Sequence, residues 1–273
     1  LPRPPEAFDV RNIISSDTGM LTKLKEKFLY PEPPLYNEEI ECLQKVGLTF
    51  VTPLSINPVN LDNVKIGLSI SEPSDYELIN KGIHGDLLIQ LSQELSRHLL
   101  ARKAELLYGG DIRPGGFTQF IFDEAMALNA RMNSETIRVK NYIGWPIYNG
   151  DSESLKEWNC KYRNIARMIN TPFPEDVKLL VPNGSENAFL PPINTQNCYV
   201  WGRSLTNMRY ELIGNSDIRI SAGGKHLNYK GRMPGVLEEI AITIMQKKPL
   251  YLLGGFGGVT SSVCEMIEKN ELP

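Results

Sequence analysis

Three glycine-rich turns carry most of the chemistry that this sequence offers. They occupy residues 108–118 (YGGDIRPGGFT), 221–239 (SAGGKH followed by GRMPGVLEE) and 253–260 (LGGFGGVT). Glycine lets the backbone approach a ligand closely and adopt positive φ angles. Each turn precedes a predicted helix, whose N-terminus offers unpaired N–H groups and a partial positive charge, so phosphate is the ligand that the turns suit best. One such turn would be ordinary turn chemistry, but three in one chain favour a binding site.

None of these turns is a standard nucleotide motif. Gly115 and Gly116 are not followed by the Lys-Ser/Thr pair of a P-loop, and no turn has the G-x-G-x-x-G spacing of a dinucleotide-dependent dehydrogenase. Basic residues gather around the second turn: Arg203, Arg209, Arg219, Lys225, Lys230 and Arg232, with His226. Because the whole chain has a formal net charge of −3, this positive charge is local, which favours a small anionic ligand over nucleic acid. A solvated basic surface is the alternative.

The elements that would position the turns alternate between strands and helices from residue 64 onward. Apolar patterns predict strands at 64–70, 104–108, 137–143, 177–181, 218–222 and 250–253, and helices at about 87–102, 117–130, 155–169, 200–213, 235–246 and 259–269. This alternation predicts an α/β fold, a Rossmann-like and mostly parallel sheet with helices on both faces. Ligands bind such sheets beyond the carboxyl ends of the strands, where the glycine turns fall.

The first 60 residues differ from the rest because prolines cluster there, with short helices predicted at about 22–28 and 37–46. We expect a proline-rich N-terminal extension or linker over residues 1–60 and a nucleotide-binding domain over residues 61–273. The first residues, LPRPP, have neither the basic-then-apolar order of a signal peptide nor an initiator methionine. We therefore interpret the chain as a fragment of a longer protein or as a processed product.

Composition restricts the remaining classes of protein. With 41% hydrophobic and 22% charged residues the chain is ordinary for a globular protein, and its apolar runs are too short for a membrane helix. Cys42, Cys160, Cys198 and Cys264 are widely spaced and form no zinc or C-x-x-C pattern. We expect reduced thiols in a cytoplasmic protein that binds no metal, membrane or nucleic acid.

Three segments, taken in order, resemble the SLOG superfamily. They are residues 203–209 (RSLTNMR), the predicted strand that ends in Ala222-Gly223-Gly224, and residues 235–239 (GVLEE). The resemblance covers about residues 64–270. In the enzymatic LOG, or lysine decarboxylase-like, branch it implies phosphoribohydrolases that cut the N-glycosidic bond of cytokinin nucleotides. Arg209 would then match the catalytic arginine, and Glu238 or Glu239 the glutamate.

The GGD and RPGGF stretches of the first turn are more similar to the prokaryotic sensor branch of the same superfamily. Members of that branch are fused to TIR or sirtuin-like effectors in antiphage systems such as Thoeris, where the domain binds an ADP-ribose isomer made from NAD. This chain departs from the enzymes' pattern: Ala222 replaces a proline, Val236 replaces a threonine, and about ten residues, 225–234, are inserted. An inserted loop could close over a ligand larger than a mononucleotide, so the departures favour binding over hydrolysis.

The resulting hypothesis is a sensor domain for an NAD-derived nucleotide, without a cofactor, that forms a homo-oligomer and regulates an effector domain. The alternatives are a nucleoside-monophosphate N-glycosidase that uses Arg209, Glu238 and Glu239, and a structural module with a degenerate pocket. The predicted ligand-binding residues are Ser69, Ser71, Glu72, Gly109, Gly110, Asp111, Arg113, Gly115, Gly116, Phe117, Arg203, Arg209, Gly223, Gly224, Lys225, Arg232, Gly235, Glu238, Gly255, Phe256 and Gly257.

Overall fold

A parallel sheet forms the centre of the molecule. The structure is a computed structural model that describes residues 28–30, 32–45, 47–110, 112–150, 152–181 and 189–270. In these residues the main sheet has six parallel strands in the order β6-β5-β4-β3-β7-β8. The strands are β3 (Lys65–Ser71), β4 (Glu105–Tyr108), β5 (Val139–Ile143), β6 (Ala166–Asn170), β7 (Ile218–Gly223) and β8 (Leu250–Leu253).

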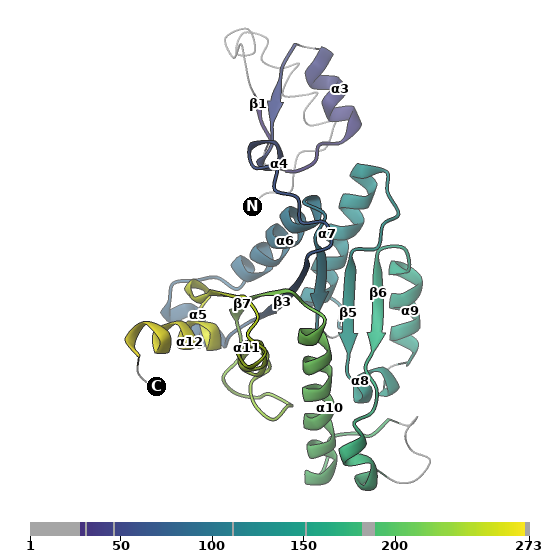
Figure 1. Ribbon diagram of the computed structural model, residues 1–273, viewed down its shortest axis with the longest axis vertical. Helices are drawn as coiled ribbons and strands as arrows, with labels where there is room; N and C mark the ends of the chain where they lie inside the picture. The colour runs from purple at the N-terminus through teal and green to yellow at the C-terminus, as the bar shows by residue number, and fades with distance from the viewer. Residues whose placement is uncertain are drawn as a thin grey trace.

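Helices cover both faces of this sheet (Figure 1). They are α5 (Asp75–Asn80), α6 (Asp86–Ala101), α7 (Phe117–Met132), α8 (Trp145–Gly150), α9 (Ser152–Tyr162), α10 (Thr195–Gly214), α11 (Gly235–Met245) and α12 (Gly258–Lys269), with 3-10 helices η1 (Glu175–Leu180) and η2 (Gly254–Phe256). On one face, Leu88 of α6 and Phe122 of α7 pack into the cluster that contains Leu68 and Leu106. The predicted Rossmann-like α/β fold is confirmed.

The opposite face belongs to α10 and α11. Met208 and Leu212 of α10 pack on Leu107, the strand neighbour of Leu106, because successive side chains of a strand point to opposite faces. Val236 and Ile240 of α11 lie in the cluster against which Leu250 of β8 packs. The two helices thus cover the strands on either side of β3.

The chain reverses its direction of travel across the sheet at β3. Strands β4, β5 and β6 are added on one side of β3, and β7 and β8 on the other. Because all pairings are parallel, the carboxyl ends of the strands lie at one edge of the sheet. The reversal makes the carboxyl ends of β3 and β7 a topological switch point, where open α/β sheets bind their ligands.

Two sequence-based predictions were wrong. The helix predicted over residues 155–169 ends at Tyr162, and β6 follows it, because Ala166–Asn170 pairs along its whole length with β5. The strand predicted at 177–181 is instead largely the 3-10 helix η1. There Val177 and Val181 fill a cluster with Trp145 and Val200, so local apolar packing replaced strand pairing.

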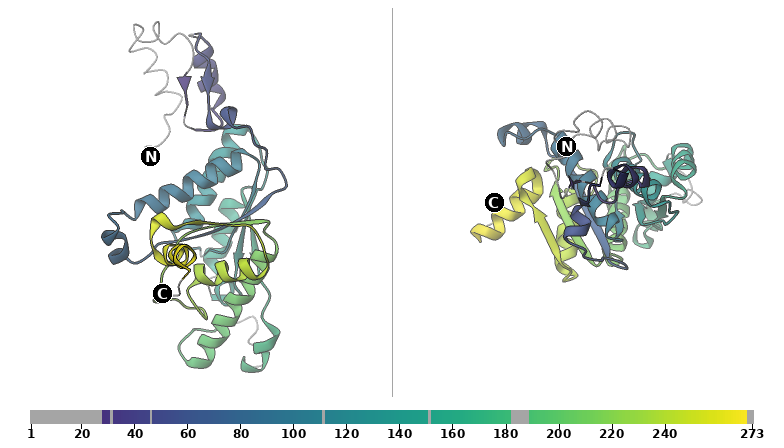
Figure 2. Two further views of the ribbon diagram at one scale, coloured as in Figure 1. Left: turned by 60° about the vertical axis from the view of Figure 1, so that its left-hand side comes forward. Right: turned by 90° about the horizontal axis from the view of Figure 1, so that it is seen from above.

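A small N-terminal module, residues 28–59, stands beyond the ends of α6 and α7 (Figures 1 and 2). Its elements are β1 (Phe28–Leu29), α3 (Asn37–Lys45), β2 (Phe50–Val51) and α4 (Pro53–Ile56), and β1 pairs with β2 in parallel. Tyr30, Leu35, Leu43 and Leu48 form its own buried cluster. The helix predicted over 37–46 is confirmed as α3. The one predicted over 22–28 lies outside the described residues apart from Phe28, which is in β1.

Candidate functional site

The second and third glycine turns meet at the switch point between β3 and β7. The N–H of Gly224 donates to the carbonyl of Ser71 at 2.7 Å, and the Gly224 carbonyl accepts from the N–H of Val259 at 3.1 Å. Four glycines of these turns have left-handed backbone conformations, namely Gly223, Gly224, Gly257 and Gly258, with φ of +66°, +99°, +74° and +64°. These hydrogen bonds and backbone conformations hold the two turns together at the start of helix α12. We call the two joined turns the clasp.

Glycine is required in this clasp because the turns approach each other too closely for side chains. A Cβ atom on Gly223 would lie 2.3 Å from the carbonyl oxygen of Ser71, and one on Gly258 would lie 2.3 Å from the carbonyl oxygen of Gly224. Gly255, in the same third turn, has open space at the Cβ position and is exposed. The third turn thus combines glycines needed for folding with one that the fold does not require.

Polar side chains from α5 and the loop after β7 border this clasp. The Lys81 ammonium, which follows α5, donates to the Ser261 hydroxyl in the first turn of α12 at 2.8 Å. His226 Nδ1 lies 2.6 Å from Glu77 Oε1, and its Nε2 lies 3.0 Å from the Ser262 hydroxyl. We call these five residues the rim, and we use the word crevice for the ligand site expected at the switch point that they border. The rim places Lys81 beside the N-terminus of α12. The lysine charge and the helix N-terminus would both favour an anion there.

Glu77 is held in its charged form at the rim. Burial by itself would raise its pKa, but the hydrogen bonds from Ser74 and the neighbouring His226 together lower it. Glu77 and Lys81 were missed from the sequence, because residues 72–86 show no paired glycines and no regular apolar pattern. Their position directly after the central strand β3 is the signal that could have found them.

Two glutamates proposed as catalytic groups lie inside the protein. Glu238 pairs with Arg209 and accepts from the hydroxyl of Thr206 at 2.6 Å. The residue is 3% exposed, and Arg209 is 8% exposed. A second contact joins the Arg209 Nε to Glu239 Oε1 at 3.7 Å. The carboxylate and the guanidinium thus neutralise each other between α10 and α11.

Glu239 is engaged in the same way with an arginine of the sheet. Arg219 is the second residue of β7. Its Nη1 lies 2.8 Å from Glu239 Oε2 and donates to the Ser69 hydroxyl at 2.8 Å, while Ser69 donates to Glu239. A Cβ on Gly67 would lie 2.5 Å from Arg219 Nη2, so a glycine in β3 makes room for this guanidinium. Arg219 is fully buried, and burial lowers its pKa while Glu239 opposes that effect.

The inserted loop 225–234 folds against Arg209. Cβ atoms on Gly231 and Gly235 would lie 3.0 and 2.7 Å from the terminal nitrogens of Arg209. The backbone of the loop and of the start of α11 therefore packs directly against the guanidinium. On the outside of the same loop, Lys230 lies over the ring of Trp201 at 5.5 Å from its centroid. Lys225 and Arg232 are exposed there.

The first glycine turn lies at the same edge, beyond β4. The amide of Gly110 donates to Asn141 Oδ1 at 3.1 Å, and a Cβ there would lie 2.1 Å from the Thr118 hydroxyl. Gly109 packs on Leu212, with 2.9 Å between an added Cβ and that side chain. Gly116 is the N-cap of α7, and Gly115 has φ of +72°.

The predicted site residues fall into three groups. Ser71, Gly223, Gly224, Gly255 and Gly257 are brought together at the switch point, with the exposed Glu72 following β3 and Lys225 following β7. Ser69, Arg209 and Glu238 lie in the buried ion-pair network. The rest lie elsewhere: Gly109, Gly110, exposed Arg113, Gly115, Gly116 and Phe117 in the first turn, Arg232 and Gly235 beside Arg209, and Phe256 against the core.

Arg203 and Asp111 were also predicted to bind the ligand. The guanidinium of Arg203 is taken by Asp176 of η1, with contacts of 2.7 Å from Nε and 2.6 Å from Nη2. Three of the six clustered cations, Arg203, Arg209 and Arg219, are therefore paired with carboxylates. Asp111 lies outside the described residues.

Among the described residues no three His, Cys, Asp or Glu side chains gather as metal ligands would. No described helix is long and apolar enough to span a bilayer.

The fold and its glycine-lined switch point define a Rossmann-like ligand-binding domain. A family model, SLOG cluster2, matches residues 60–273, which is most of the chain. The chain therefore belongs to the SLOG cluster2 family, and this membership indicates a domain for nucleotide-related ligands. None of the curated proteins compared with the chain matches it.

Proposed function

We propose that this chain is a sensor domain that binds an NAD-derived nucleotide, an ADP-ribose isomer, at the switch point between β3 and β7. The observation that carries the proposal is the meeting of the Gly223-Gly224 and Gly257-Gly258 turns at the end of β3, beside the N-terminus of α12. Backbone that close to a helix N-terminus suits a phosphate group. A diphosphate would reach from there toward Lys81 and the loop cation Lys225.

Binding without hydrolysis is favoured by the state of the two glutamates. Hydrolysis of an N-glycosidic bond needs a carboxylate that stabilises an oxocarbenium-like centre or activates water. Glu238 and Glu239 are 3% and 6% exposed, and arginines neutralise both of them. Neither carboxylate faces an open crevice, so the same residues that could serve an enzyme here stabilise the interior.

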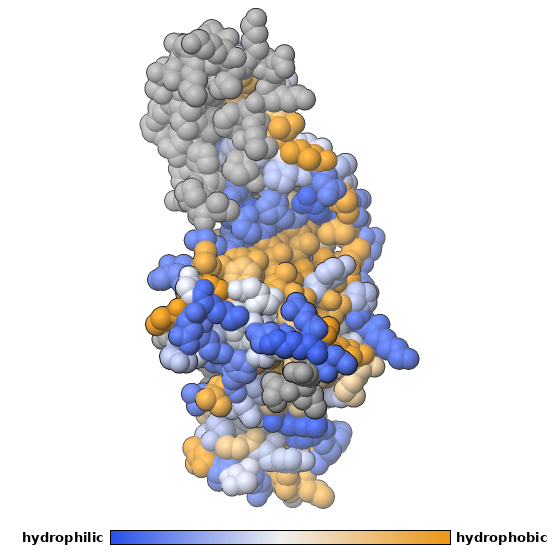
Figure 3. Space-filling view, turned by 90° about the vertical axis from the view of Figure 1, so that its left-hand side faces the viewer, coloured by the Kyte–Doolittle hydropathy of each residue, from blue (hydrophilic) through white to orange (hydrophobic). Residues whose placement is uncertain are grey.

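The role in a larger assembly is part of the same proposal. The resemblance to the prokaryotic sensor branch supports regulation of an attached TIR or sirtuin-like effector in cytoplasmic antiphage defence. A homo-oligomer is supported by apolar surface: β8 is one of the two edge strands of the main sheet, and Tyr251 on it is 59% exposed. Figure 3 shows a band of apolar surface on the side of the molecule where α5 and α12 lie.

The experiment that tests the proposal separates binding from turnover. The purified chain is titrated calorimetrically with ADP-ribose, cyclic ADP-ribose isomers, NAD and AMP, and each ligand is then recovered and examined by chromatography. We expect an ADP-ribose isomer to bind more tightly than AMP and to be recovered intact after hours. Release of free base from AMP at ordinary enzyme rates, about 1–1000 per second, would overturn the sensor and favour the N-glycosidase.

A further inference from the structure

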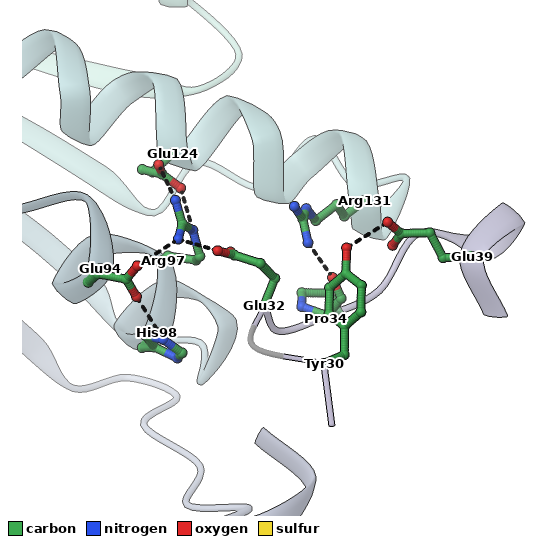
Figure 4. Close-up of polar contacts among 9 residues, drawn as sticks. All are labelled: Tyr30, Glu32, Pro34, Glu39, Glu94, Arg97, His98, Glu124 and Arg131. Carbon is green, nitrogen blue, oxygen red and sulfur yellow. Dashed lines mark hydrogen bonds and ion pairs between the residues drawn. The ribbon is translucent and has the colours of Figure 1, made fainter. Parts of the chain in front are cut away.

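The N-terminal module rests on the C-terminal ends of α6 and α7 through polar contacts (Figure 4). Arg131 of α7 donates to the carbonyl of Pro34 at 2.8 Å and lies over the ring of Tyr36 at 4.6 Å from its centroid. Arg102, at the end of α6, donates to the carbonyl of Pro53 at 3.2 Å. The module's apolar cluster is separate from the main core. Polar contacts between separate cores are typical of units that move relative to each other.

The central contact of this interface gathers three carboxylates around one guanidinium. Arg97 of α6 contacts Glu32 of the module at 2.5 Å, Glu94 at 3.0 Å and Glu124 of α7 at 2.8 Å. The side chains of Arg97 and Glu32 are 15% and 5% exposed. With all three carboxylates ionised, Arg97 faces three negative charges. Arg131, whose charge also acts on Glu32, and His98, 3.1 Å from Glu94, are further charged or titratable groups beside them.

Among the three carboxylates around Arg97, Glu32 is the one whose hydrogen bonding is incomplete. Its Oε2 atom is buried without a hydrogen-bond partner among the described residues. Burial raises the pKa of Glu32, Glu94 and Glu124 reinforce that rise, and the charges of Arg97 and Arg131 oppose it. A buried, incompletely paired charge is costly. Docking the module therefore brings an ionised carboxylate into a site that favours its neutral form.

The connection between the module and the sheet offers little resistance to movement. Residues 57–60 form an exposed connector without helix or strand, which leads into β3. The chain passes from the module to the sheet through this stretch (Figure 1). A change of angle there would break the arginine contacts but would leave both apolar cores intact.

We propose that residues 28–59 are a movable arm, and that Glu32 is the group whose neutralisation fixes the arm on α6 and α7. These two helices begin at the carboxyl edge of the sheet and end at the arm. Each has 16 residues and so is about 24 Å long, at about 1.5 Å per residue. The arm therefore contacts α6, which also reaches the switch point, because its Leu88 lies beside Gly223. The proposal does not depend on which ligand the crevice binds.

The direction of the pH dependence follows from linkage. Because the pKa of Glu32 is higher in the docked state than in solvent, docking takes up protons. The stabilisation is complete below the ordinary carboxyl pKa and is lost as the pH rises through the docked-state value. With one proton linked, the docking equilibrium falls by at most about tenfold per pH unit.

The test uses the full chain and the neutral, nearly isosteric variant Glu32→Gln. Glu41→Gln is the matched control, because it removes a charge from an exposed residue of α3 in the same module. Small-angle scattering reports how far the arm extends, over a range from the ordinary carboxyl pKa of about 4.3 up to about pH 8.5. Amide exchange at one pH compares protection at the ends of α6 and α7 between variants, and protection of β3 and β7 confirms that the fold is intact.

We expect wild type and Glu41→Gln to extend as the pH rises, and Glu32→Gln to remain compact with severalfold slower exchange at the helix ends. Arg97→Met, which removes the cation, should be extended throughout the range. A wild-type profile that does not change with pH would overturn the proposal. So would a Glu32→Gln variant that follows the wild-type curve, or an Arg97→Met variant that stays docked with wild-type protection.

Discussion

Arg219 and Glu239 form an ion pair in the interior, and their burial sets what either residue can do. Arg219 is fully buried, and its charge partner among the described residues is Glu239 at 2.8 Å. Removing one member of such a pair leaves an uncompensated charge in the interior, at a cost of about 3–5 kcal/mol. The first role of both residues is therefore to stabilise the sheet and its contact with α11.

The first prediction concerns this pair. Glu239→Gln should lower the free energy of unfolding by about 3–5 kcal/mol, measured by chemical denaturation. Glu41→Gln, in the exposed Lys45–Glu41 pair, should change it by less than about 0.5 kcal/mol. Equal stability of wild type and Glu239→Gln would show that the carboxylate of Glu239 is not needed to compensate the buried charge of Arg219.

The second prediction compares two glycines of the third turn. Gly258→Ala should destabilise the protein by about 1–3 kcal/mol, because its Cβ would lie 2.3 Å from a backbone oxygen at a φ of +64°. Gly255→Ala meets open space and should be nearly neutral. The midpoints of thermal unfolding measure both. Indistinguishable midpoints for the two variants would contradict the tight clasp at the switch point.

At the scale of elements, the sequence predicted well those strands and helices whose apolar pattern is local. It placed α6, α7, α10, α11 and α12 within a few residues of their ends, and it placed the glycine turns after β4, β7 and β8. It failed at β6, since Ala166–Asn170 reads as a helical continuation until β5 supplies hydrogen-bond partners. Non-local pairing of this kind has no local signal.

The site was predictable to a similar extent. Glycine spacing identified the turns that meet at the switch point. It did not reveal that Arg209 and Arg219 point inward to Glu238 and Glu239, because a charged residue in a helix or strand normally faces solvent. The inward direction of Arg219 depends on Gly67 in β3, whose missing side chain leaves room for the guanidinium.

The third prediction tests the contribution of the element α5 to the crevice. Lys81→Met keeps the aliphatic stem that packs near Gly257 but removes the charge beside the N-terminus of α12. A charge-assisted hydrogen bond is worth about 1.5–3 kcal/mol, so affinity for an ADP-ribose isomer should fall by roughly ten- to a hundredfold. Calorimetry measures the change.

The control for this variant lies on the other end of α12. Lys269→Met removes a lysine that pairs with Glu265 on the surface, and it should leave the affinity unchanged. If Lys81→Met and Lys269→Met bound the nucleotide equally well, the rim would not take part in binding.

For the whole molecule, the expected ligand site and the arm lie at opposite ends of the helices that cover the sheet. The glycine turns lie at the carboxyl edge, and the arm lies beyond the far ends of α6 and α7 (Figure 1). A ligand that repositioned α6 at the switch point, where Leu88 lies beside Gly223, would reach the contact of Arg97 with the arm. This arrangement suits a domain that binds a signal at one edge and passes the effect on at the other.

The central claim is that a nucleotide lies on the backbone of the third glycine turn, and one pair of variants tests it directly. Gly255→Leu and Gly214→Leu each place a side chain in open space, so both variants should fold normally. Gly255 borders the proposed site, whereas Gly214 ends α10 at the opposite edge of the sheet. Calorimetric titration with the ADP-ribose isomer should show binding lost in Gly255→Leu and retained in Gly214→Leu. Wild-type affinity in a correctly folded Gly255→Leu variant would contradict the claim.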